Sequence, residues 1–156
     1  MIKTDIPGRG NMEIENILLD LNGTIATDGK IPLDVREKIN LLSEKVTIYI
    51  LTADTQGTAE EEVRGMNADM IKIAEEDSKN RKFEFLNTFD FEKTVAIGNG
   101  NNDQLILKEA ALGIAVLGDE GMYVSALKNA DIVVKNIVDA LDLFLKPKRL
   151  MATLRE

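Results

Sequence analysis

Short apolar runs alternate with amphipathic segments along most of the chain, and this alternation limits the fold more than any other feature. The apolar runs predict strands at residues 14–19, 46–51, 68–73, 94–97, 112–116 and 131–134. The intervening segments predict helices at residues 32–45, 55–64, 75–89, 101–111, 120–127 and 136–145. Nearly continuous apolar strands that alternate with helices are typical of a parallel sheet covered on both faces. The sequence therefore predicts an α/β, three-layer, Rossmann-like fold.

The domain organisation expected from the sequence is simple. A length of 156 residues suits one domain, and no linker divides the chain. Residues 1–13 mix charged residues with Pro7 and two glycines, which predicts a flexible tail. Residues 14–146 form the expected single domain. Pro147 is expected to close the last helix, which leaves residues 147–156 as a C-terminal tail.

The composition removes several classes of chemistry. The chain has no histidine and no cysteine, so Ser-His-Asp triads, zinc sites with imidazole or thiolate ligands, and disulfides are excluded. A formal net charge of −8 argues against nucleic acid and anionic membranes as partners. No apolar run approaches the roughly 20 residues of a membrane helix, and no export signal is visible, so we expect a cytoplasmic protein. Carboxylates, lysines, hydroxyls and backbone amides remain, and these groups suit phosphate and hard metal ions.

Polar residues follow the predicted strands where ligands bind in parallel sheets, at the strand carboxyl ends. Asp20 ends the first strand and is followed by Leu21, Asn22, Gly23 and Thr24. The carboxylate suits a nucleophile or metal ligand, while Gly23 and Thr24 suit an approaching oxyanion. An ordinary turn with a capping Asp or Asn explains the same residues.

Two later strand ends carry similar signals. Thr52, Ala53 and Asp54 follow the second strand, where a hydroxyl and the amides of a helix start can bind phosphate. A simple helix N-cap is the alternative. Residues 98–103 (Gly-Asn-Gly-Asn-Asn-Asp) are dense in glycine and short polar residues, which favours a loop around a metal ion and a phosphate over a glycine-rich turn. Lys79 is a candidate for neutralising phosphoryl charge, although a single lysine is usually only solvated.

In combination, these segments resemble the haloacid dehalogenase-like superfamily from about Ile14 to Val134. The stretches Leu51-Thr52-Ala53-Asp54 and Thr58-Ala59-Glu60 are similar to motifs in the phosphorylation domain of P-type ATPases. Residues 98–103, followed by Ala110 and by residues 113–116, look like the ATPase hinge motif and its next strand. Lys79 lies where the family lysine precedes an apolar helix face formed here by Phe83 and Leu86, and Lys82 is the second choice.

The resemblance implies a mechanism through an aspartyl-phosphate. Asp20 would be the nucleophile, and Asn22 would occupy the position of the acid–base residue while its backbone carbonyl helps to bind Mg²⁺. Mg²⁺ itself suits a few carboxylates, waters and phosphate oxygens. The remaining metal positions would be Asn99 and Asp103. The phosphoryl oxygens would be held by Gly23, Thr24, Thr52, Ala53 and Lys79.

Two positions depart from the family pattern, because amides replace acids. Asn22 cannot transfer a proton, and positioned acid–base catalysis is worth about 10²- to 10⁴-fold, or roughly 3–5 kcal/mol in the barrier. P-type ATPases also lack an acid at this position. Asn99 brings no charge to a metal ion that the family binds with an Asp. The sequence therefore predicts slow phosphoryl chemistry or a retired site.

The intervals between the motifs are too short for an inserted cap or nucleotide-binding domain. Only 31 residues separate Asp20 from Thr52. An open site would accept a phosphorylated small molecule or protein, or be covered by another subunit, which favours a homo-oligomer. The leading prediction is thus a slow Mg²⁺-dependent phosphohydrolase. The alternatives are a non-catalytic phosphate- or partner-binding module of the same fold, and a flavodoxin-like signalling domain in which Asp20, Thr52 and Asp103 do not cluster.

Overall fold

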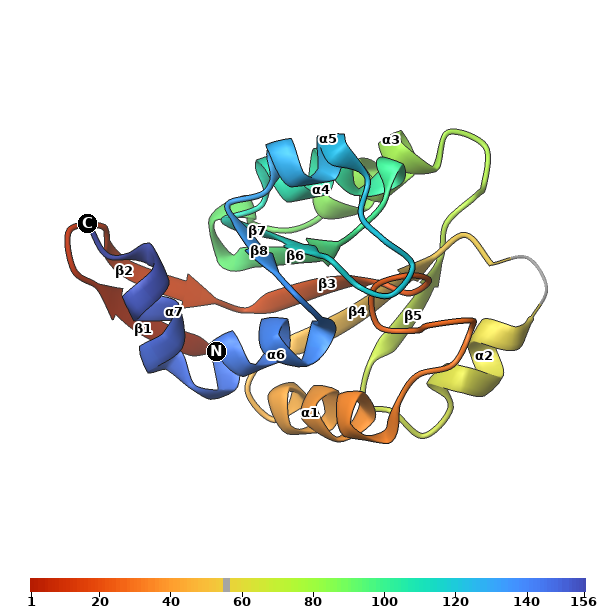
Figure 1. Cartoon of the computed structure of the whole chain (residues 1–156), viewed down its shortest axis with the longest axis horizontal. Helices are drawn as coiled ribbons and strands as arrows, with labels where there is room; N and C mark the ends of the chain where they lie inside the picture. Colours follow the sequence, from red (N-terminus) through yellow and green to blue (C-terminus); the bar gives the residue numbers. More distant parts are fainter. Residues whose placement is uncertain (55–56) are drawn as a thin grey trace.

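The computed structural model describes residues 1–54 and 57–156, and its centre is a parallel sheet (Figure 1). Six strands of the described chain lie in the order β5-β4-β3-β6-β7-β8. Their bounds are β3 Asn16–Asp20, β4 Thr47–Thr52, β5 Asp69–Lys72, β6 Thr94–Gly98, β7 Leu112–Val116 and β8 Ile132–Val134. Every neighbouring pair is parallel, so the predicted sheet is confirmed.

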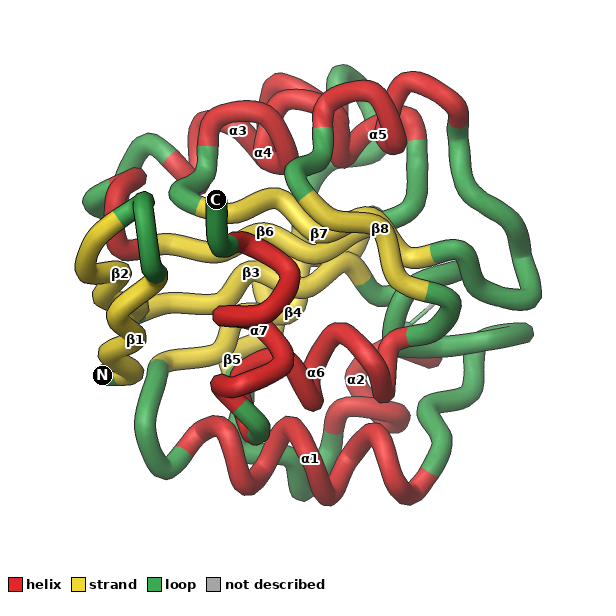
Figure 2. The backbone as a smooth tube through the Cα atoms, turned by 60° about the vertical axis from the view of Figure 1, so that its left-hand side comes forward, coloured by secondary structure: helices red, strands yellow, loops and turns green. Residues whose placement is uncertain are grey.

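Helices cover both faces of this sheet (Figure 2). One face carries α3 (Ser78–Leu86), α4 (Gln104–Glu109) and α5 (Val124–Asn129). The other carries α1 (Leu33–Ser43), α2 (Thr58–Val63) and α6 (Ile137–Leu145). Two short 3-10 turns, η1 (Phe91–Lys93) and η2 (Asn101–Asp103), flank β6. The predicted start of the second helix at Thr55 lies outside the described residues.

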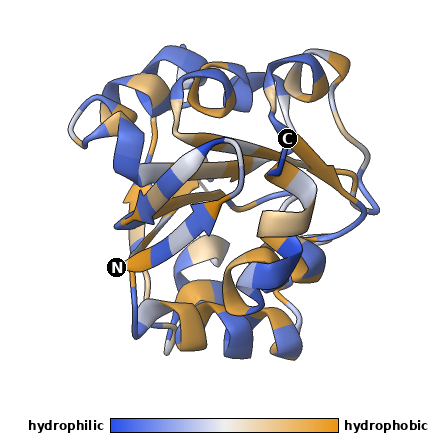
Figure 3. Ribbon diagram, turned by 90° about the vertical axis from the view of Figure 1, so that its left-hand side faces the viewer, coloured by the Kyte–Doolittle hydropathy of each residue, from blue (hydrophilic) through white to orange (hydrophobic). Residues whose placement is uncertain are grey.

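The alternation of side chains along β3 shows why the sheet has two cores. Ile17 and Leu19 pack into the core on the side of α1 and α6, whereas Leu18 packs into the core on the side of α3, α4 and α5. Successive residues of a strand point to opposite faces, so a strand covered on both sides must be apolar throughout. The hydropathy colouring shows these central strands in the hydrophobic colour (Figure 3).

The strand order creates a switch point beside β3. After β3 the chain forms β4 and β5 on one side, and then returns to form β6 on the other side. Loops at such a switch diverge, which leaves a crevice at the carboxyl ends of the strands where ligands bind in α/β proteins. Asp20, at the end of β3, and the loop that follows β6 therefore lie side by side.

The N-terminal segment is not the flexible tail that its composition predicts. β1 (Ile2–Ile6) and β2 (Gly10–Ile14) form an antiparallel hairpin. Ile2, Thr4 and Ile6 are buried in strict alternation with exposed residues, which is the period of a half-buried strand. Glycine and proline lie in the turn between the two strands, where these residues are common. Their presence made the composition of the segment resemble that of a flexible tail.

The C-terminal segment is also ordered. α7 (Pro147–Leu154) packs against β1, and its Leu150 is buried. Pro147 begins this helix, whereas the sequence led us to expect only that it ends α6. Proline is suited to the first helical position because the N–H it lacks has no helical partner there. None of the helices in the described chain is long and apolar enough to cross a membrane.

Candidate active site

Asp20 occupies the end of β3 and is almost entirely buried, with 7% of its surface exposed. Its Oδ1 atom accepts a hydrogen bond from Lys82 Nζ at 2.6 Å, and its Oδ2 atom accepts one from Thr24 Oγ1 at 3.1 Å. Burial and the nearby charge of Asp103 raise the pKa of Asp20 to about 6, although Lys82 and Thr24 oppose this rise. The side chain is therefore mostly a carboxylate at neutral pH and is held in one orientation.

Lys82 forms the centre of the charged cluster. Its side chain is fully buried, and its Nζ atom also lies 2.7 Å from Asp103 Oδ1. Burial tends to lower the pKa of Lys82, but the negative charges of Asp20 and Asp103 outweigh it and raise that pKa above its usual value. Two carboxylates and one ammonium group thus neutralise one another in part, and Asp20 and Asp103 meet at a single cation.

The lysine at the site is Lys82, so the choice of Lys79 was wrong. Lys79 lies in the first turn of α3 and is exposed. The prediction assumed that Phe83 and Leu86 define the inner face, which would place Lys79 in line with them. In the structure Phe83 is only half-buried, and the inner face runs through Lys82 and Leu86, four residues apart.

Asp103 organises the loop after β6. Its Oδ2 atom accepts hydrogen bonds from the backbone N–H groups of Asn99 at 3.0 Å and Gly100 at 2.9 Å, while its Oδ1 atom accepts from Lys82. Both oxygens therefore have protein donors. The carboxylate therefore shapes the loop and fixes the lysine, and its support of a metal ion stays a prediction.

Asn99 joins three loops of the site. Its Oδ1 atom lies 3.1 Å from Thr24 Oγ1 and shares the single hydroxyl hydrogen of Thr24 with Asp20 Oδ2, and its Nδ2 atom donates to the carbonyl of Gly121 at 3.1 Å. Gly23 has a φ of +79°, and a Cβ atom there would collide with the Asn99 amide. The contribution of Gly121 could not be predicted from the sequence, because residues 118–121 carry only the signal of an ordinary glycine turn.

The other predicted phosphate-binding residues lie at the end of β4. Thr52 is buried, and its Oγ1 atom accepts a hydrogen bond from the Asp54 N–H at 3.0 Å. Ala53 is half-buried. The Asp54 side chain accepts hydrogen bonds from Thr58 Oγ1 and the Ala59 N–H, both at 2.9 Å, and so ties this strand end to α2. Asn22 is exposed in the turn after β3.

The donor set available to a metal ion is small. Within residues 1–54 and 57–156, no group of three or more acidic residues is placed to hold a metal ion. The nearby oxygen donors are the carboxylates of Asp20 and Asp103, the Asn99 amide oxygen and the backbone carbonyl of Asn22, and each of the three side chains also accepts a hydrogen bond within the protein. These are hard oxygen donors. They fit Mg²⁺ in the form it takes beside phosphate, with one or two carboxylates and several waters.

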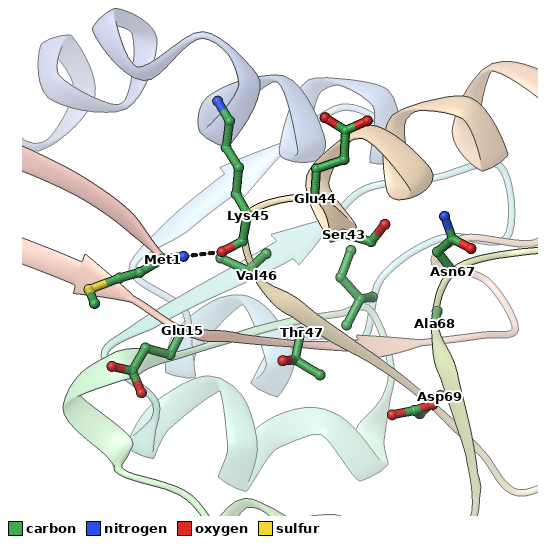
Figure 4. Close-up of a pocket in the computed structure, with 11 residues that line it drawn as sticks. Met1, Glu15, Ser43, Glu44, Lys45, Val46, Thr47, Asn67, Ala68 and Asp69 are labelled. Atoms are coloured by element: carbon green, nitrogen blue, oxygen red, sulfur yellow. Dashed lines mark hydrogen bonds between the residues drawn. The ribbon is translucent and has the colours of Figure 1, made fainter.

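A pocket of about 720 Å³ lies at the opposite, amino-terminal edge of the sheet (Figure 4). Glu15, Thr47 and Asp69 line it, and they lie just before β3 or at the starts of β4 and β5. The α-amino group of Met1 donates to the carbonyl of Lys45 here. This pocket is separated from Asp20 by the length of the strands, so it takes no part in the chemistry considered for Asp20.

Sequence comparison finds near relatives over part of the chain. No protein-family model matches it. An uncharacterized protein of Methanocaldococcus jannaschii is 59% identical over 64 residues, which are 41% of this chain and 69% of the relative. A second uncharacterized protein of that organism is 67% identical over 39 residues, which are 25% of this chain and 89% of the relative. The chain belongs to one family with these two proteins.

Structural comparison finds similar folds over nearly the whole chain. The 3-deoxy-D-manno-octulosonate 8-phosphate phosphatase of Moraxella catarrhalis, solved with magnesium, phosphate and its sugar, matches with a TM-score of 0.71 at 14% identity, covering 91% of this chain and 94% of that one. The cobalt-bound enzyme of Haemophilus influenzae has a TM-score of 0.72 at 12% identity, covering 92% and 94%.

A third solved structure carries the superfamily name. A Legionella pneumophila protein described as a HAD superfamily hydrolase of subfamily III A has a TM-score of 0.71 at 14% identity, covering 90% of this chain and 86% of that one. The narrower resemblance to P-type ATPases stays a prediction. The chain has the haloacid dehalogenase-like fold of the HAD superfamily, with no cap domain in the part that the structure describes.

Proposed function

We propose that this protein is a slow, Mg²⁺-dependent phosphohydrolase that works through an aspartyl-phosphate on Asp20. The observation that carries the proposal is the placement of Asp20 at a strand end, with its carboxylate oriented by Lys82 at 2.6 Å and Thr24 at 3.1 Å. The similarity of the fold to phosphatases of the HAD superfamily supports the same conclusion.

In the first step, a carboxylate oxygen of Asp20 attacks phosphorus. A P–O bond to Asp20 forms, and the bond from phosphorus to the alcohol oxygen breaks, so the alcohol leaves and takes its proton from water. Thr24, Thr52 and the backbone N–H group of Ala53 stabilise the phosphoryl oxygens. The backbone N–H of Gly23, which the sequence also suggested for this role, donates instead to the Ala26 carbonyl at 2.9 Å. In the second step, water attacks the aspartyl-phosphate, which releases phosphate and restores the carboxylate.

Lys82 and Asp103 act on this chemistry through Asp20. The Lys82 ammonium group keeps Asp20 ionised and aligned, and Asp103 holds the ammonium group in place. Bound Mg²⁺ supplies charge stabilisation to the phosphoryl group. The residues that would hold the ion are Asp20, Asn22 through its backbone carbonyl, Asn99 through its amide oxygen, and Asp103 directly or through water.

The reaction is slow because no acid stands at position 22. An exposed Asn22 neither protonates the leaving alcohol nor activates water, so esters of alcohols that leave without protonation are the favoured substrates.

The substrate class is a phosphorylated small molecule or protein. We propose the cytoplasm as the compartment and a homo-oligomer as the assembly, since an uncapped site gains cover from a second copy.

The proposal is tested with an aryl phosphate and Mg²⁺. The Asp20→Asn protein should lose turnover and should no longer accept a beryllofluoride adduct, because the amide is a poor nucleophile. Asp5→Asn, which changes an exposed carboxylate of the hairpin, serves as the matched control and should behave as the unmodified protein. Equal rates for Asp20→Asn and the unmodified protein would refute the proposal.

A second candidate function is a non-catalytic module that binds phosphate or a phosphorylated partner. It is favoured by the Asn99 amide, whose oxygen lies within hydrogen-bond distance of Thr24 and whose nitrogen donates to the Gly121 carbonyl, contacts that suit a structural position. Restoring both acids with Asn22→Asp and Asn99→Asp separates the two candidates. A large rise in rate indicates an intact catalytic scaffold, whereas stable phosphate binding without turnover in either protein indicates the binding module.

A further inference from the structure

Both amides that stand in place of an acid at the candidate site are followed by glycine. The pairs are Asn22-Gly23 and Asn99-Gly100, and no other asparagine in the sequence precedes a glycine. An asparagine in such a pair can lose its amide without an enzyme, because the backbone nitrogen of the next residue attacks the side-chain carbonyl carbon. Glycine permits this attack most readily, since it has no side chain to obstruct the approach. The two amides therefore lie at the positions of the chain where conversion to an acid is chemically easiest.

The structure distinguishes the two asparagines. Asn22 is exposed, and within the described chain no residue forms a hydrogen bond with its side-chain amide. Asn99 is half-buried, and its Nδ2 atom donates to the Gly121 carbonyl at 3.1 Å. The nitrogen that would attack Asn99 is held as well, because the Gly100 N–H donates to Asp103 Oδ2 at 2.9 Å. The side chain of Asn22 is therefore free to rotate toward its neighbour, whereas that of Asn99 is fixed.

We propose that Asn22 deamidates spontaneously and that the resulting aspartate supplies the acid–base group that the slow enzyme lacks. The inference rests on the proposed function and adds a covalent modification that regulates it. The Gly23 nitrogen forms a bond to Asn22 Cγ, and the bond from Cγ to Nδ2 breaks, so ammonia leaves with the proton of the Gly23 N–H. Water then opens the cyclic imide, and no other reactant is needed.

The turn after β3 favours aspartate over the isomeric product. If water attacks Cγ, the ring opens to aspartate and the backbone is unchanged. If water attacks the backbone carbonyl carbon, the chain continues through Cγ as isoaspartate and gains one CH₂ group. Ala26 resists this lengthening, because its N–H donates to the Leu21 carbonyl and its carbonyl accepts from the Gly23 N–H, both at 2.9 Å. These two bonds lie on either side of residue 22, so aspartate keeps the folded turn and isoaspartate strains it.

The hydrogen bond between Gly23 and Ala26 also sets the pace of the modification. The Gly23 N–H must leave the Ala26 carbonyl before its nitrogen can reach Cγ of Asn22, so the reaction needs a local opening of the turn. A freshly made chain therefore carries the amide, and an older population carries a rising fraction of aspartate. The consequence is a protein whose rate of hydrolysis increases with its age.

The test compares fresh protein with protein aged in warm, mildly alkaline buffer. Peptide mass spectrometry measures the deamidated fraction at positions 22 and 99, and comparison with synthetic peptides separates aspartate from isoaspartate. Hydrolysis in the presence of Mg²⁺ is measured with methyl phosphate, whose alcohol needs a proton to leave, and with an aryl phosphate, whose alcohol does not. We expect position 22 to convert several times faster than position 99, and mainly to aspartate.

The rate of hydrolysis should rise with the aspartate fraction. The Asn22→Asp protein gives the rate at full conversion, which should exceed that of fresh protein by about 10²-fold or more with methyl phosphate and by less with the aryl ester. The aged protein should reach the part of this gain that its aspartate fraction predicts. Asn22→Gln is the control, because its longer side chain closes a ring far more slowly, and its rate should not change with age. Asp20→Asn should stay inactive at every age.

The outcomes separate the inference from the function on which it rests. If position 22 converts no faster than position 99, or mainly to isoaspartate, the inference is overturned while the phosphohydrolase stands. A rate that stays constant while the aspartate fraction rises, or that rises equally in the Asn22→Gln protein, overturns the inference in the same way. If neither the unmodified nor the Asn22→Asp protein hydrolyses either ester, the proposed function fails and the inference fails with it.

Discussion

The Lys82 ammonium group pairs with two carboxylates that would otherwise repel each other in the protein interior. Asp20 and Asp103 lie 2.6 and 2.7 Å from its Nζ atom, and both are almost fully buried. Buried ion pairs add little net stability, but removing one partner leaves uncompensated buried charge. The stability of the protein is therefore more sensitive to this lysine than to any solvated one.

Lys82→Met should lower the free energy of unfolding by about 3–5 kcal/mol, because two buried carboxylates lose their counter-charge. Urea denaturation followed by circular dichroism measures this loss. Lys79→Met, on the exposed side of the same helix, is the control and should change stability by no more than about 0.5 kcal/mol. Similar losses of unfolding free energy for the Lys82→Met and Lys79→Met proteins would contradict the assignment of Lys82 as the partner of the two buried carboxylates.

At position 99, an amide in place of an acid should make Mg²⁺ binding depend on phosphate. Asn99→Asp adds a negative charge beside Asp20, so Mg²⁺ alone should bind about tenfold more tightly than in the unmodified protein. The measurement is the rise in melting temperature on adding Mg²⁺, with and without phosphate, within each protein. Asn101→Asp is the control, because it adds the same charge to an exposed residue of the same loop. The prediction would be contradicted if Mg²⁺ alone raised the melting temperature of the unmodified protein as much as Mg²⁺ with phosphate does.

At the scale of elements, Asp142 ties α6 to α1 and α7. Its carboxylate lies 2.5 Å from Lys38 Nζ, 2.7 Å from Lys146 Nζ and 3.2 Å from Arg149 Nη1. Burial favours a higher pKa for Asp142, but hydrogen bonds from Lys146 and Lys38 outweigh it and hold that pKa below its usual value. The helices on this side of the sheet are thus joined at one carboxylate.

An Asp carboxyl group has a pKa of about 3.9 in the unfolded chain. When folding lowers this pKa, the ionised group stabilises the folded protein above about pH 3.9. The stabilisation is lost as the pH falls through the pKa of the folded state. Asp142→Asn should therefore cost about 1–3 kcal/mol at neutral pH. The difference from the unmodified protein should shrink when urea denaturation is repeated below about pH 4. Asp139→Asn, on the same helix, controls for loss of charge alone. If the difference in unfolding free energy between the Asp142→Asn and unmodified proteins stays constant with pH, the ionised Asp142 carboxylate is not the source of the stabilisation.

At the scale of the whole molecule, the two ends of the chain close the core beyond the sheet. Ile2 and Ile14 of the hairpin and Leu150 of α7 belong to the same apolar cluster as β3, α1 and α6. The hairpin and α7 therefore depend on each other for burial, and the core on this side depends on both.

A chain that ends at Lys146 should unfold at a temperature lower by at least about 5 °C, because it removes Leu150 from the core and leaves β1 without the helix that packs against it. Differential scanning calorimetry measures the shift. A chain that ends at Leu154 lacks only two exposed residues and should melt as the full chain does. Equal melting temperatures for the two shortened chains would show that α7 adds nothing to the core.

The sequence by itself determined the parallel sheet and the strand-end positions of Asp20, Thr52 and the loop at residues 98–103. These features depend on local periodicity, because a strand buried on both faces must be apolar and a polar residue that follows it must lie at its end. Only the tertiary structure decided that Lys82 meets Asp20, from 62 residues away, and that the Asn99 amide joins Thr24 to Gly121. It also decided that the chain ends pack together. Such choices depend on helix rotation and on contacts between distant segments, which neighbouring residues do not encode.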